Sequence, residues 1–456
     1  MGKPHHILVA GAGLVGSLLA LMLGQRGYRV TVLEKRSDMR RHGVSAGRSI
    51  NLALAERGIH ALDRAGLMDQ VQPILIPMRG RQLHDPDGTQ RFLSYGQRPG
   101  EVIWSVSRGQ LNILMMNAAE QHFDVDILFN QSIEAVDFSS RRVTLRDEVC
   151  DRTTSLEFEL LIGADGVASR VRDDLLKAAH GNCSIDFLEH QYKELSLPAG
   201  PGGQWQIERE ALHIWPRGGY MLIALPNLDG SFTVTLFLSR SGDPGFDLID
   251  EPAELIRFFA RQFPDVDELI PDLQAEYFGN PTGMLGTVRC DRWALDSGGL
   301  ILGDAAHGVV PFHGQGMNAG FEDCSELCRL LDDHQDDWSR VLPQFEQERI
   351  PNANAIADMA LENYITMRDS VNDPDFELKK QLGFRLEQMF PQRFIPRYSM
   401  VMFHRIPYAE VFRRGKIQAD ILDDLVAAGT TPENLDERAA GHLVNSRLVT
   451  GPPMRI

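Results

Sequence analysis

Three glycines near the start of the chain have the spacing of a nucleotide-binding turn. Gly11, Gly13 and Gly16 form a Gly-x-Gly-x-x-Gly pattern between an apolar run and a helix-forming segment, and a second apolar run ends on Glu34. In a strand–turn–helix–strand unit, such glycines let the backbone approach a pyrophosphate at the helix N-terminus, and the acid accepts hydrogen bonds from ribose hydroxyls. The pattern therefore predicts dinucleotide binding. The alternative is a glycine-rich turn in an α/β protein that binds no nucleotide.

Two more acids follow apolar, strand-like runs. These are Asp165, which stands before a glycine, and Asp304, after which a loop leads to Gly316, Met317 and Asn318 at the start of an expected helix. The free N–H groups and the positive end of that helix suit an anion. An Asp-Gly pair after a strand is also common in simple turns, so both interpretations stay open for Asp165.

Five basic side chains have two interpretations each. Arg48 could face a phosphate or a flavin, or it could be a surface charge. Arg79 and Arg81 alternate along an expected strand and would share one side, which is either solvated or, more rarely, an anion clamp. His307 and His313 flank the loop described above and are candidate acid–base groups, although lone histidines are more often structural.

Composition excludes several classes of protein. The chain has 456 residues, a formal net charge of −17 and five cysteines. The acidic charge argues against nucleic acid or an anionic membrane as a partner. Only Cys324 and Cys328 are close in sequence, without further ligands at zinc spacing, so we expect reduced thiols and no metal site. Because no run approaches the ~18 apolar residues of a membrane span, and no signal peptide is found, a cytoplasmic location is expected.

Periodicity and turn residues predict the elements that position these groups. A helix is expected over 48–65, a strand over 78–84 and a strand over 127–136. Hairpin signals separate β-rich segments over 211–238, which indicates an antiparallel sheet inserted into an α/β framework. Apolar spacing predicts helices over 251–270, from 316 to about 331, and over most of 338–427 with a break at 390–398; the tail after 429 has turn composition.

The predicted fold class is α/β. A Rossmann-like FAD-binding domain would carry an inserted antiparallel substrate domain and a C-terminal helical region. The expected parts are the first framework segment 1–184, the inserted sheet 185–285, the returning framework 286–335 and the helical cap 336–456.

Together, the three motifs resemble those of the FAD-dependent aromatic hydroxylases. The residues that carry the resemblance are Gly11 to Gly16 with Glu34, Asp165 with Gly166, and Gly303 and Asp304 with the loop 311–318. It implies a non-covalent FAD, with NADPH as a transient co-substrate because a second glycine turn for a nicotinamide nucleotide is missing. It also implies backbone donors from Met317 and Asn318 beside the flavin, where a positive helix end would stabilise the anionic reduced form.

Four further segments are similar to the kynurenine 3-monooxygenase family over nearly the whole chain. They are residues 47–58, 78–81, 359–364 and 393–400. The resemblance implies hydroxylation of L-kynurenine to 3-hydroxykynurenine with NADPH and O₂, through a flavin C4a-hydroperoxide, in tryptophan degradation. No obligatory catalytic base is expected, because the aryl amine of kynurenine already activates the ortho carbon.

The same resemblance assigns residues. Arg81, Tyr95, Asn363 and Tyr398 would hold the amino-acid head of kynurenine, and Phe312 would border its ring. A guanidinium suits this task because it can bond both oxygens of a carboxylate. For Asn363, Tyr398 and Phe312, capping or ordinary packing stays the alternative. The residues expected to contact FAD are Gly11, Gly13, Gly16, Glu34, Arg36, Arg48, Arg108, Val136, Asp165, Asp304, Gly316, Met317 and Asn318.

Two other functions stay open at this point. One is a flavin hydroxylase or halogenase of another aromatic compound, although the Trp-x-Trp-x-Ile-Pro pattern of tryptophan halogenases is missing. The other is a non-catalytic flavin-binding regulator. The helices after about residue 380 are expected to cap the substrate pocket, and no apolar membrane tail is seen after 427. The chain is expected to work as a monomer or homodimer.

Overall fold

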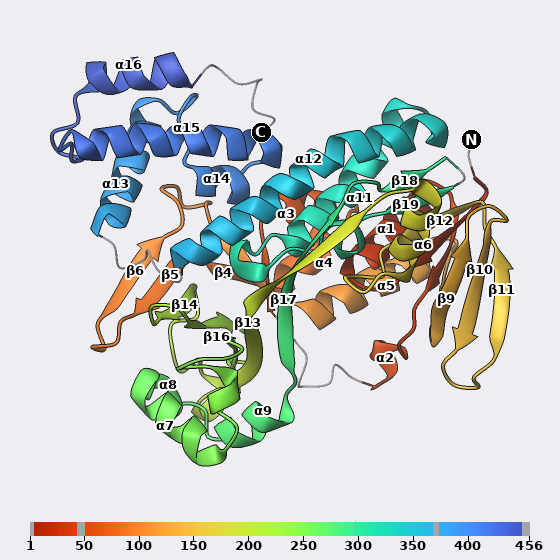
Figure 1. The fold of residues 1–456 in the computed structure, drawn as a ribbon, viewed down its shortest axis with the longest axis horizontal. Helices are drawn as coiled ribbons and strands as arrows, with labels where there is room; N and C mark the ends of the chain where they lie inside the picture. The colour runs from red at the N-terminus through yellow and green to blue at the C-terminus, as the bar shows by residue number, and fades with distance from the viewer. Residues whose placement is uncertain (1–3, 43–50, 297, 368–373, 449–456) are drawn as a thin grey trace. The chain divides into compact units, whose positions relative to one another are not determined.

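The computed structural model describes residues 4–42, 51–296, 298–367 and 374–448 (Figure 1). The chain divides into two compact units. The first unit comprises residues 1–76, 104–188 and 284–357, and the second comprises 77–103, 189–283 and 358–456. Residues 77–103 therefore group with the second unit, although the boundaries expected from sequence put them in the first framework segment.

A six-stranded sheet forms the centre of the first unit. Its strands are β18 (Ala294–Leu295), β19 (Gly299–Ile301), β12 (Leu160–Gly163), β1 (His6–Ala10), β2 (Arg29–Leu33) and β8 (Val125–Leu128), in that order. All neighbours are parallel except β18 and β19. The β1 side chains from Ile7 to Ala10 are fully buried, as expected for a parallel strand covered on both faces.

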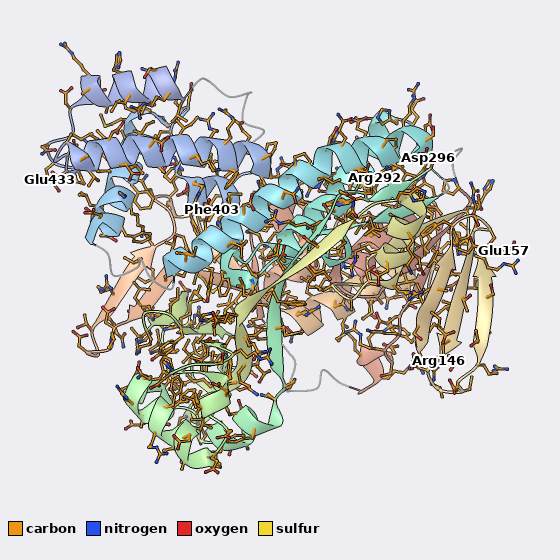
Figure 2. All side chains as sticks on the ribbon, in the orientation of Figure 1. Arg146, Glu157, Arg292, Asp296, Phe403 and Glu433 are labelled. Carbon is orange, nitrogen blue, oxygen red and sulfur yellow. The ribbon has the colours of Figure 1, made fainter. Side chains whose placement is uncertain are left out.

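Helices and a small sheet cover the central sheet. Helices α1 (Leu14–Gln25), α5 (Arg108–His122) and α11 (Gly316–Asp333) pack side by side, and α3 (Glu56–Arg64) packs on α11. Helix α6 (Arg170–Ala179) packs against β9 (Gln131–Asp137), which pairs with β10 (Arg142–Asp147), itself paired with β11 (Thr153–Glu157). Figure 2 shows Arg146 and Glu157 pointing outward from this small sheet. Short elements complete the unit: α2 (Met39–His42), α4 (Met68–Val71), α10 (Asp304–His307) and the 3₁₀ turns Gln72–Ile74 and Pro311–His313.

Two predictions for the first unit are wrong. The expected helix over 48–65 begins only at Glu56, because β3 (Asn51–Leu54) pairs with β7 (Ile103–Ser107) and this pairing overrides local preference. The expected strand over 127–136 is two strands, β8 and β9, which belong to different sheets. Between them Asn130 has a φ of +57°, a turn conformation that ends the first strand.

The second unit is built on an antiparallel sheet, as predicted. Most of this seven-stranded sheet lies in the second unit, while most of β17 and the start of β13 belong to the first. Its order is β17 (Thr282–Cys290), β13 (Cys183–Leu197), β16 (Phe232–Ser239), β15 (Met221–Pro226), β14 (Ala211–Pro216), β5 (Gly80–His84) and β6 (Gln90–Ser94). Both predicted hairpin turns are present, with positive φ at Gly218, Gly219 and Gly230. Only β14 and β5 pair in parallel among the pairs described. The preceding strand β4 (Leu75–Met78) lies in a separate three-stranded sheet.

Helices cover one face of this sheet. They are α7 (Pro252–Gln262) and α8 (Pro264–Asp267), which match the helical spacing predicted over 251–270, and α9 (Leu273–Gly279), which was not predicted. Trp215, Leu222 and Leu236 from the strands share one core with Phe259 and Phe263 from this helical layer.

The C-terminal part is helical. It contains α12 (Trp338–Ile365), α13 (Pro374–Met389), α14 (Arg397–Met402), α15 (Tyr408–Ala427) and α16 (Glu437–Arg447). The predicted break after residue 390 is confirmed, but the expectation of an irregular tail after 429 is wrong. Asp436 accepts a hydrogen bond from Ala439 N at 2.7 Å and caps α16, whose Ala440 and Val444 are buried.

No helix in the described ranges is long and apolar enough to cross a bilayer. All five cysteines are free thiols, as expected, and no cluster of potential metal ligands is found among the residues that the structure describes.

Candidate active site

The glycine turn has the geometry of a pyrophosphate cradle. Gly11 has a φ of +94°, which favours glycine, and a Cβ at Gly16 would lie only 1.9 Å from the Gly11 carbonyl oxygen. At Gly13, in contrast, a Cβ would meet no atom within 4 Å. Gly13 also precedes the first residue of α1 and leaves the helix N-terminus uncovered. The space in front of α1 is therefore open for a group that approaches the backbone, as a pyrophosphate would.

Glu34 lies at the end of β2, next to this turn. Its carboxylate accepts hydrogen bonds from Ala12 N at 2.8 Å and from Arg36 Nε at 2.8 Å, and it is buried. Burial raises the pKa of Glu34, but the bonds from Arg36 and the Ala12 amide outweigh it, so the pKa lies below its usual value. Glu34 is therefore an anion fixed beside the turn, and the Arg36 guanidinium that covers it is mostly exposed.

Asp165 caps a helix in this structure. Its carboxylate accepts hydrogen bonds from Ser169 Oγ at 2.5 Å and from Arg170 N at 2.8 Å at the start of α6. Burial raises the pKa of Asp165 in spite of these bonds. The side chain thus has a capping role, and any contact with a cofactor would be an additional one.

Asp304 presents an exposed carboxylate. Gly303 adopts φ +59° and ψ −147°, which turns the chain sharply after β19. Asp304 is exposed, and no hydrogen bond or ion pair to its carboxylate occurs among the described residues. A Cβ at Gly316, the first residue of α11, would lie 3.9 Å from Asp304 Oδ1. The acid and the N-terminus of α11 therefore face one small space.

Asn318 fixes that helix end. Its side chain is fully buried, with Oδ1 accepting from Ala55 N and Nδ2 donating to the carbonyls of Ala53 and Gly314, each at 2.8 Å. The amide is thus fully used, and only backbone N–H groups of this turn are available to a ligand. The first amide of this turn that is seen to bond back is that of Ala319, to Gln315 O. The donors expected at Met317 and Asn318, together with the Gly316 amide, are consequently left for an external acceptor.

A buried ionic network, which sequence reasoning missed, supports this loop. Asp323 accepts from Gly303 N at 2.9 Å and from Arg349 Nε at 2.8 Å, and lies 2.5 Å from His307 Nε2. Arg349 also binds Glu322 at 2.8 Å. Burial raises the pKa of Asp323, but the charges of His307 and Arg349 outweigh this effect and bring the pKa below its usual value. Asp323 therefore stays ionised. The sequence signal that could have revealed the network is Asp323 itself, an acid four residues before Leu327 on the apolar face of the helix.

This network gives one candidate base a structural role. His307 stacks on Trp293 with centroids 5.0 Å apart and is paired with Asp323, so its position is structural. His313 is also buried, within the 3₁₀ turn before α11.

The remaining expected FAD residues are dispersed within the first unit. Arg108 is exposed at the start of α5, where Ser107 provides the cap. Val136 is buried, and its amide donates to Asp174 Oδ2 at 2.9 Å. Arg48 lies outside the described residues.

Three of the expected substrate residues meet in the second unit. The Arg81 guanidinium carbon lies 5.7 Å from the ring centroid of Tyr95 and 5.1 Å from that of Tyr398. The two rings stack, with centroids 5.5 Å apart and planes 12° apart. Arg81 Nε and Tyr95 Oη are buried without a hydrogen-bond partner among the described residues. A buried, unsatisfied guanidinium nitrogen is costly, which indicates that a ligand completes this cluster.

The secondary structure explains how these residues meet. Arg81 is on β5, and Tyr95 follows β6 and donates its amide to Arg79 O at 3.1 Å. Tyr398 is on α14, and α15 holds the preceding segment because Gln418 Nε2 donates to Ile395 O at 2.7 Å. Burial raises the pKa of both tyrosines although Arg81 opposes it. Both phenols are therefore neutral hydrogen-bond donors beside a cation.

The other candidates occupy different places. Arg79 is mostly exposed and pairs with Glu210 at 2.6 Å, so only Arg81 of the two arginines fits an internal anion site. Asn363 is buried on α12 in the second unit, with Nδ2 3.3 Å from Met367 Sδ. Phe312 is buried in the first unit.

The sheet register adds residues that were not predicted. Leu212 pairs with Arg81, and Ile214 on the same strand pairs with Ile223. Paired residues point to the same face of a sheet, so these three aliphatic side chains share the face of Arg81. Alternation along β14 was the signal that could have identified them.

Comparison with known proteins identifies the family. Residues 5–360 match the family described as FAD binding domain. A kynurenine 3-monooxygenase of Stenotrophomonas maltophilia (strain K279a) is 47% identical over 428 residues, covering 94% of this chain and 93% of the relative. One from Myxococcus xanthus (strain DK1622) is 46% identical, covering 97% and 95%. The chain belongs to the kynurenine 3-monooxygenase family.

Solved structures confirm the predicted fold. The tetrameric form of 2-methyl-3-hydroxypyridine-5-carboxylic acid oxygenase has a TM-score of 0.65 at 20% identity and covers 82% of this chain and 95% of its own. PqsL, a probable FAD-dependent monooxygenase from Pseudomonas aeruginosa, has a TM-score of 0.63 at 23% identity and covers 80% and 97%.

Membership of the kynurenine 3-monooxygenase family confirms the predicted activity. The protein is an FAD-dependent monooxygenase whose substrates are kynurenine, O₂ and NADPH. Neither a regulator without activity nor a hydroxylase of an unrelated aromatic compound agrees with this family. The residues of the first unit fit FAD, because an open glycine turn, an unpartnered acid and uncovered helix N–H groups are what its phosphates, ribityl chain and ring require. FAD, when bound, supplies the hydride and oxygen chemistry.

Proposed function

We propose that the cluster of Arg81, Tyr95 and Tyr398 binds the amino-acid head of L-kynurenine. The single observation that carries the proposal is the Arg81 guanidinium, whose Nε is buried without a partner between two stacked tyrosines. An α-carboxylate would satisfy Nε and the neighbouring guanidinium nitrogen together. The two phenols would donate to the same carboxylate without adding charge.

The aromatic end of kynurenine would lie over the aliphatic face of the sheet. Leu212, Ile214 and Ile223 follow Arg81 across that face. Asn363 would bind the polar head, and Phe312 is proposed to border the ring. Apolar walls exclude water from the reacting centre, which protects the reactive oxygen species from wasteful breakdown. No side chain is assigned as a catalytic base.

The FAD site is proposed for the first unit. Gly11, Gly13, Gly16 and the start of α1 would hold the pyrophosphate, and Glu34 with Arg36 would hold the ribose. Asp304 would contact the ribityl side, and the amides of Gly316, Met317 and Asn318 would face the flavin. Asp165, Val136, Arg108 and Arg48 are proposed as outer contacts.

Replacement of Arg81 by methionine tests the substrate site. Substrate affinity is measured on the FAD-bound enzyme, without O₂ or NADPH, from the change in flavin absorbance. Loss of one or two charged hydrogen bonds of about 1.5–3 kcal/mol each should weaken L-kynurenine binding at least tenfold, with FAD still bound. Replacement of the exposed Arg79 is the matched control and should leave the affinity unchanged. Equal affinity for wild type and Arg81→Met would refute the assignment.

We also propose a cytoplasmic location and a monomer or homodimer. Five free thiols support a reducing compartment. Of the expected parts, 1–184 without residues 77–103 is proposed to act as FAD framework with 286–335, and 336–456 as the cap. Residues 77–103 are proposed to act with 185–285 as the substrate sheet.

A further inference from the structure

Helix α13 of the second unit carries a buried carboxylate beside its apolar face. Leu382 and Leu386 lie in a core that also contains Ile421 of α15, and this core holds the helix. Glu387 follows Leu386 directly, and only 2% of it is exposed. A buried carboxylate stabilises a helix less well than an apolar side chain of similar size would. The burial of Glu387 is therefore explained by its polar partners and not by the packing of α13.

Two hydrogen-bond partners of Glu387 lie in the chain just after Tyr95. The carboxylate accepts from Gln97 Nε2 at 2.7 Å with one oxygen and from Arg98 Nη1 at 3.1 Å with the other. Gln97 Nε2 also donates to the Phe384 carbonyl at 3.1 Å. Helix α13 is thus bonded to the segment that continues from the substrate cluster.

That segment is a turn, and a second buried acid closes it. The Glu101 carboxylate accepts from Gln97 N at 2.7 Å and from Arg98 N at 3.1 Å, and the Arg98 side chain pairs with it as well. A Cβ at Gly96 would lie only 2.2 Å from Glu101 Oε2, so this acid packs directly on the backbone after Tyr95. Because the turn is bonded internally, a shift at Gln97 would move Tyr95 with it.

The sheet fixes Tyr95 on its other side. The Tyr95 amide donates to Arg79 O at 3.1 Å, and the Tyr95 ring stacks on Tyr398 with centroids 5.5 Å apart. The backbone after Tyr95 is held by the turn and, through the turn, by Glu387. A binding group must stay within about 0.5 Å of its productive position, and supporting hydrogen bonds hold it there.

We propose that Glu387 is a positioning residue for the amino-acid head of the substrate. By holding the turn after Tyr95, it keeps the Tyr95 phenol where it can donate to the substrate carboxylate beside Arg81. The inference deepens the proposed function and rests on Tyr95 and Arg81 as carboxylate-binding residues. Glu387 is assigned no contact with the substrate itself.

A double-mutant cycle on the FAD-bound enzyme tests the inference, with L-kynurenine affinity measured by the anaerobic absorbance titration. Glu387→Gln keeps the shape of the side chain but replaces one acceptor by a donor, so one of the two bonds to the turn is lost. Because Gln97 keeps its bond to the Phe384 carbonyl, the affinity should fall only about three- to tenfold. In the Tyr95→Phe background, the same change should weaken binding less than about twofold, because the phenol that Glu387 positions is gone.

Two controls separate positioning from general support of the helix. Glu377→Gln makes the same charge change on α13, where Glu377 accepts from the exposed Gln381 at 3.0 Å, and it should leave the affinity unchanged. The second control is a ligand, the amine that remains when L-kynurenine loses its carboxylate. Glu387→Gln should change its affinity less than about twofold, because it has no carboxylate for Tyr95. Should Glu387→Gln fail to fold, Gln97→Ala removes the same bond from the turn and should give the same pattern.

Equal weakening of L-kynurenine binding in the wild-type and Tyr95→Phe backgrounds, or equal weakening of both ligands, would overturn the inference. Should Tyr95→Phe weaken L-kynurenine binding while Glu387→Gln does not, the inference fails and the proposed substrate site stands. Should neither Arg81→Met nor Tyr95→Phe weaken it, the proposed site fails and the inference fails with it.

Discussion

Gly13 and Gly16 belong to one motif but differ in what surrounds them. A methyl group at Gly16 would collide with the Gly11 carbonyl, whereas at Gly13 it would enter open space. Gly16→Ala should therefore destabilise even the FAD-free protein, by about 1–3 kcal/mol for overpacking. Gly13→Ala should leave the FAD-free stability unchanged and weaken FAD binding.

Thermal unfolding of the FAD-free variants and FAD titration separate these effects. Gly100→Ala is the control, because Gly100 also has open space around it. Gly88 is exposed too, but its positive φ makes it unsuitable. A normal FAD affinity in Gly13→Ala would contradict the cradle.

Residue types alone suggested part of the proposed site. The glycine motif is readable because its function depends on local spacing. The Arg81 cluster came from family resemblance, since nothing local joins β5 to α14. Asp323 escaped notice for the same reason: it acquires meaning only from side chains on other elements, such as Arg349.

At the scale of elements, α11 is tied to the Gly303 turn by one carboxylate. Asp323→Asn removes a buried charge, so His307 loses its anion and Arg349 keeps only Glu322. Breaking such a pair costs about 3–5 kcal/mol. Because Gly303 N also binds Asp323, FAD affinity should fall as well.

Glu326→Gln on the same helix is the control for this variant. Glu326 pairs with Arg329 and both are partly exposed, so its loss should cost under about 1 kcal/mol. Urea denaturation of the FAD-free proteins measures both values. A similar, small cost for Asp323→Asn would show that the network does not hold the turn.

The strand pair β14–β5 contains a pH-sensitive element. His213 Nδ1 lies 2.8 Å from His84 Nε2, and His84 Nδ1 lies 3.2 Å from Asp265. Burial and the nearby His84 lower the pKa of His213 from 6.5 to about 4. Between these two pH values, His213 is therefore protonated in the unfolded chain and neutral in the folded chain.

The contribution of His213 to the free energy of unfolding is therefore complete above pH 6.5, and it is lost as the pH falls toward 4. The loss from His213 alone should reach about 3 kcal/mol. Thermal unfolding between pH 7.5 and 3.5, a range that includes both pKa values, measures it. His213→Gln should flatten the profile and His442→Gln, an exposed change on α16, should not. A profile unaltered by His213→Gln would contradict the assignment.

Elements were predicted best where burial and periodicity agree. The hairpins of the second unit and α11 follow their sequence patterns. The helix expected over 48–65 failed because pairing with β7 is a distant interaction. Helix α16 was missed although Ala440, Val444 and Leu448 recur every four residues, because turn residues before it obscured the pattern.

At the scale of the whole molecule, the FAD residues and the Arg81 cluster belong to different units. Val444→Asp would place a charge in the buried core formed by α13, α15 and α16. It should loosen the helices that support the substrate cluster and weaken kynurenine binding more than tenfold. FAD should stay bound, because its proposed contacts lie in the first unit.

The ratio of flavin to protein absorbance and an anaerobic titration measure both properties. Glu437→Gln, on the exposed side of α16, is the control. Loss of FAD together with substrate affinity would contradict separate support of the two sites.

The chain passes between the two units five times, at residues 76, 103, 188, 283 and 357. Neither unit can therefore be encoded by one uninterrupted stretch of gene. Recombination that exchanges a single block would bring along fragments of both halves, so a new aromatic substrate is more readily acquired by point changes than by swapping a module. The same threading means that neither half can finish folding on a ribosome before the other has largely been synthesised.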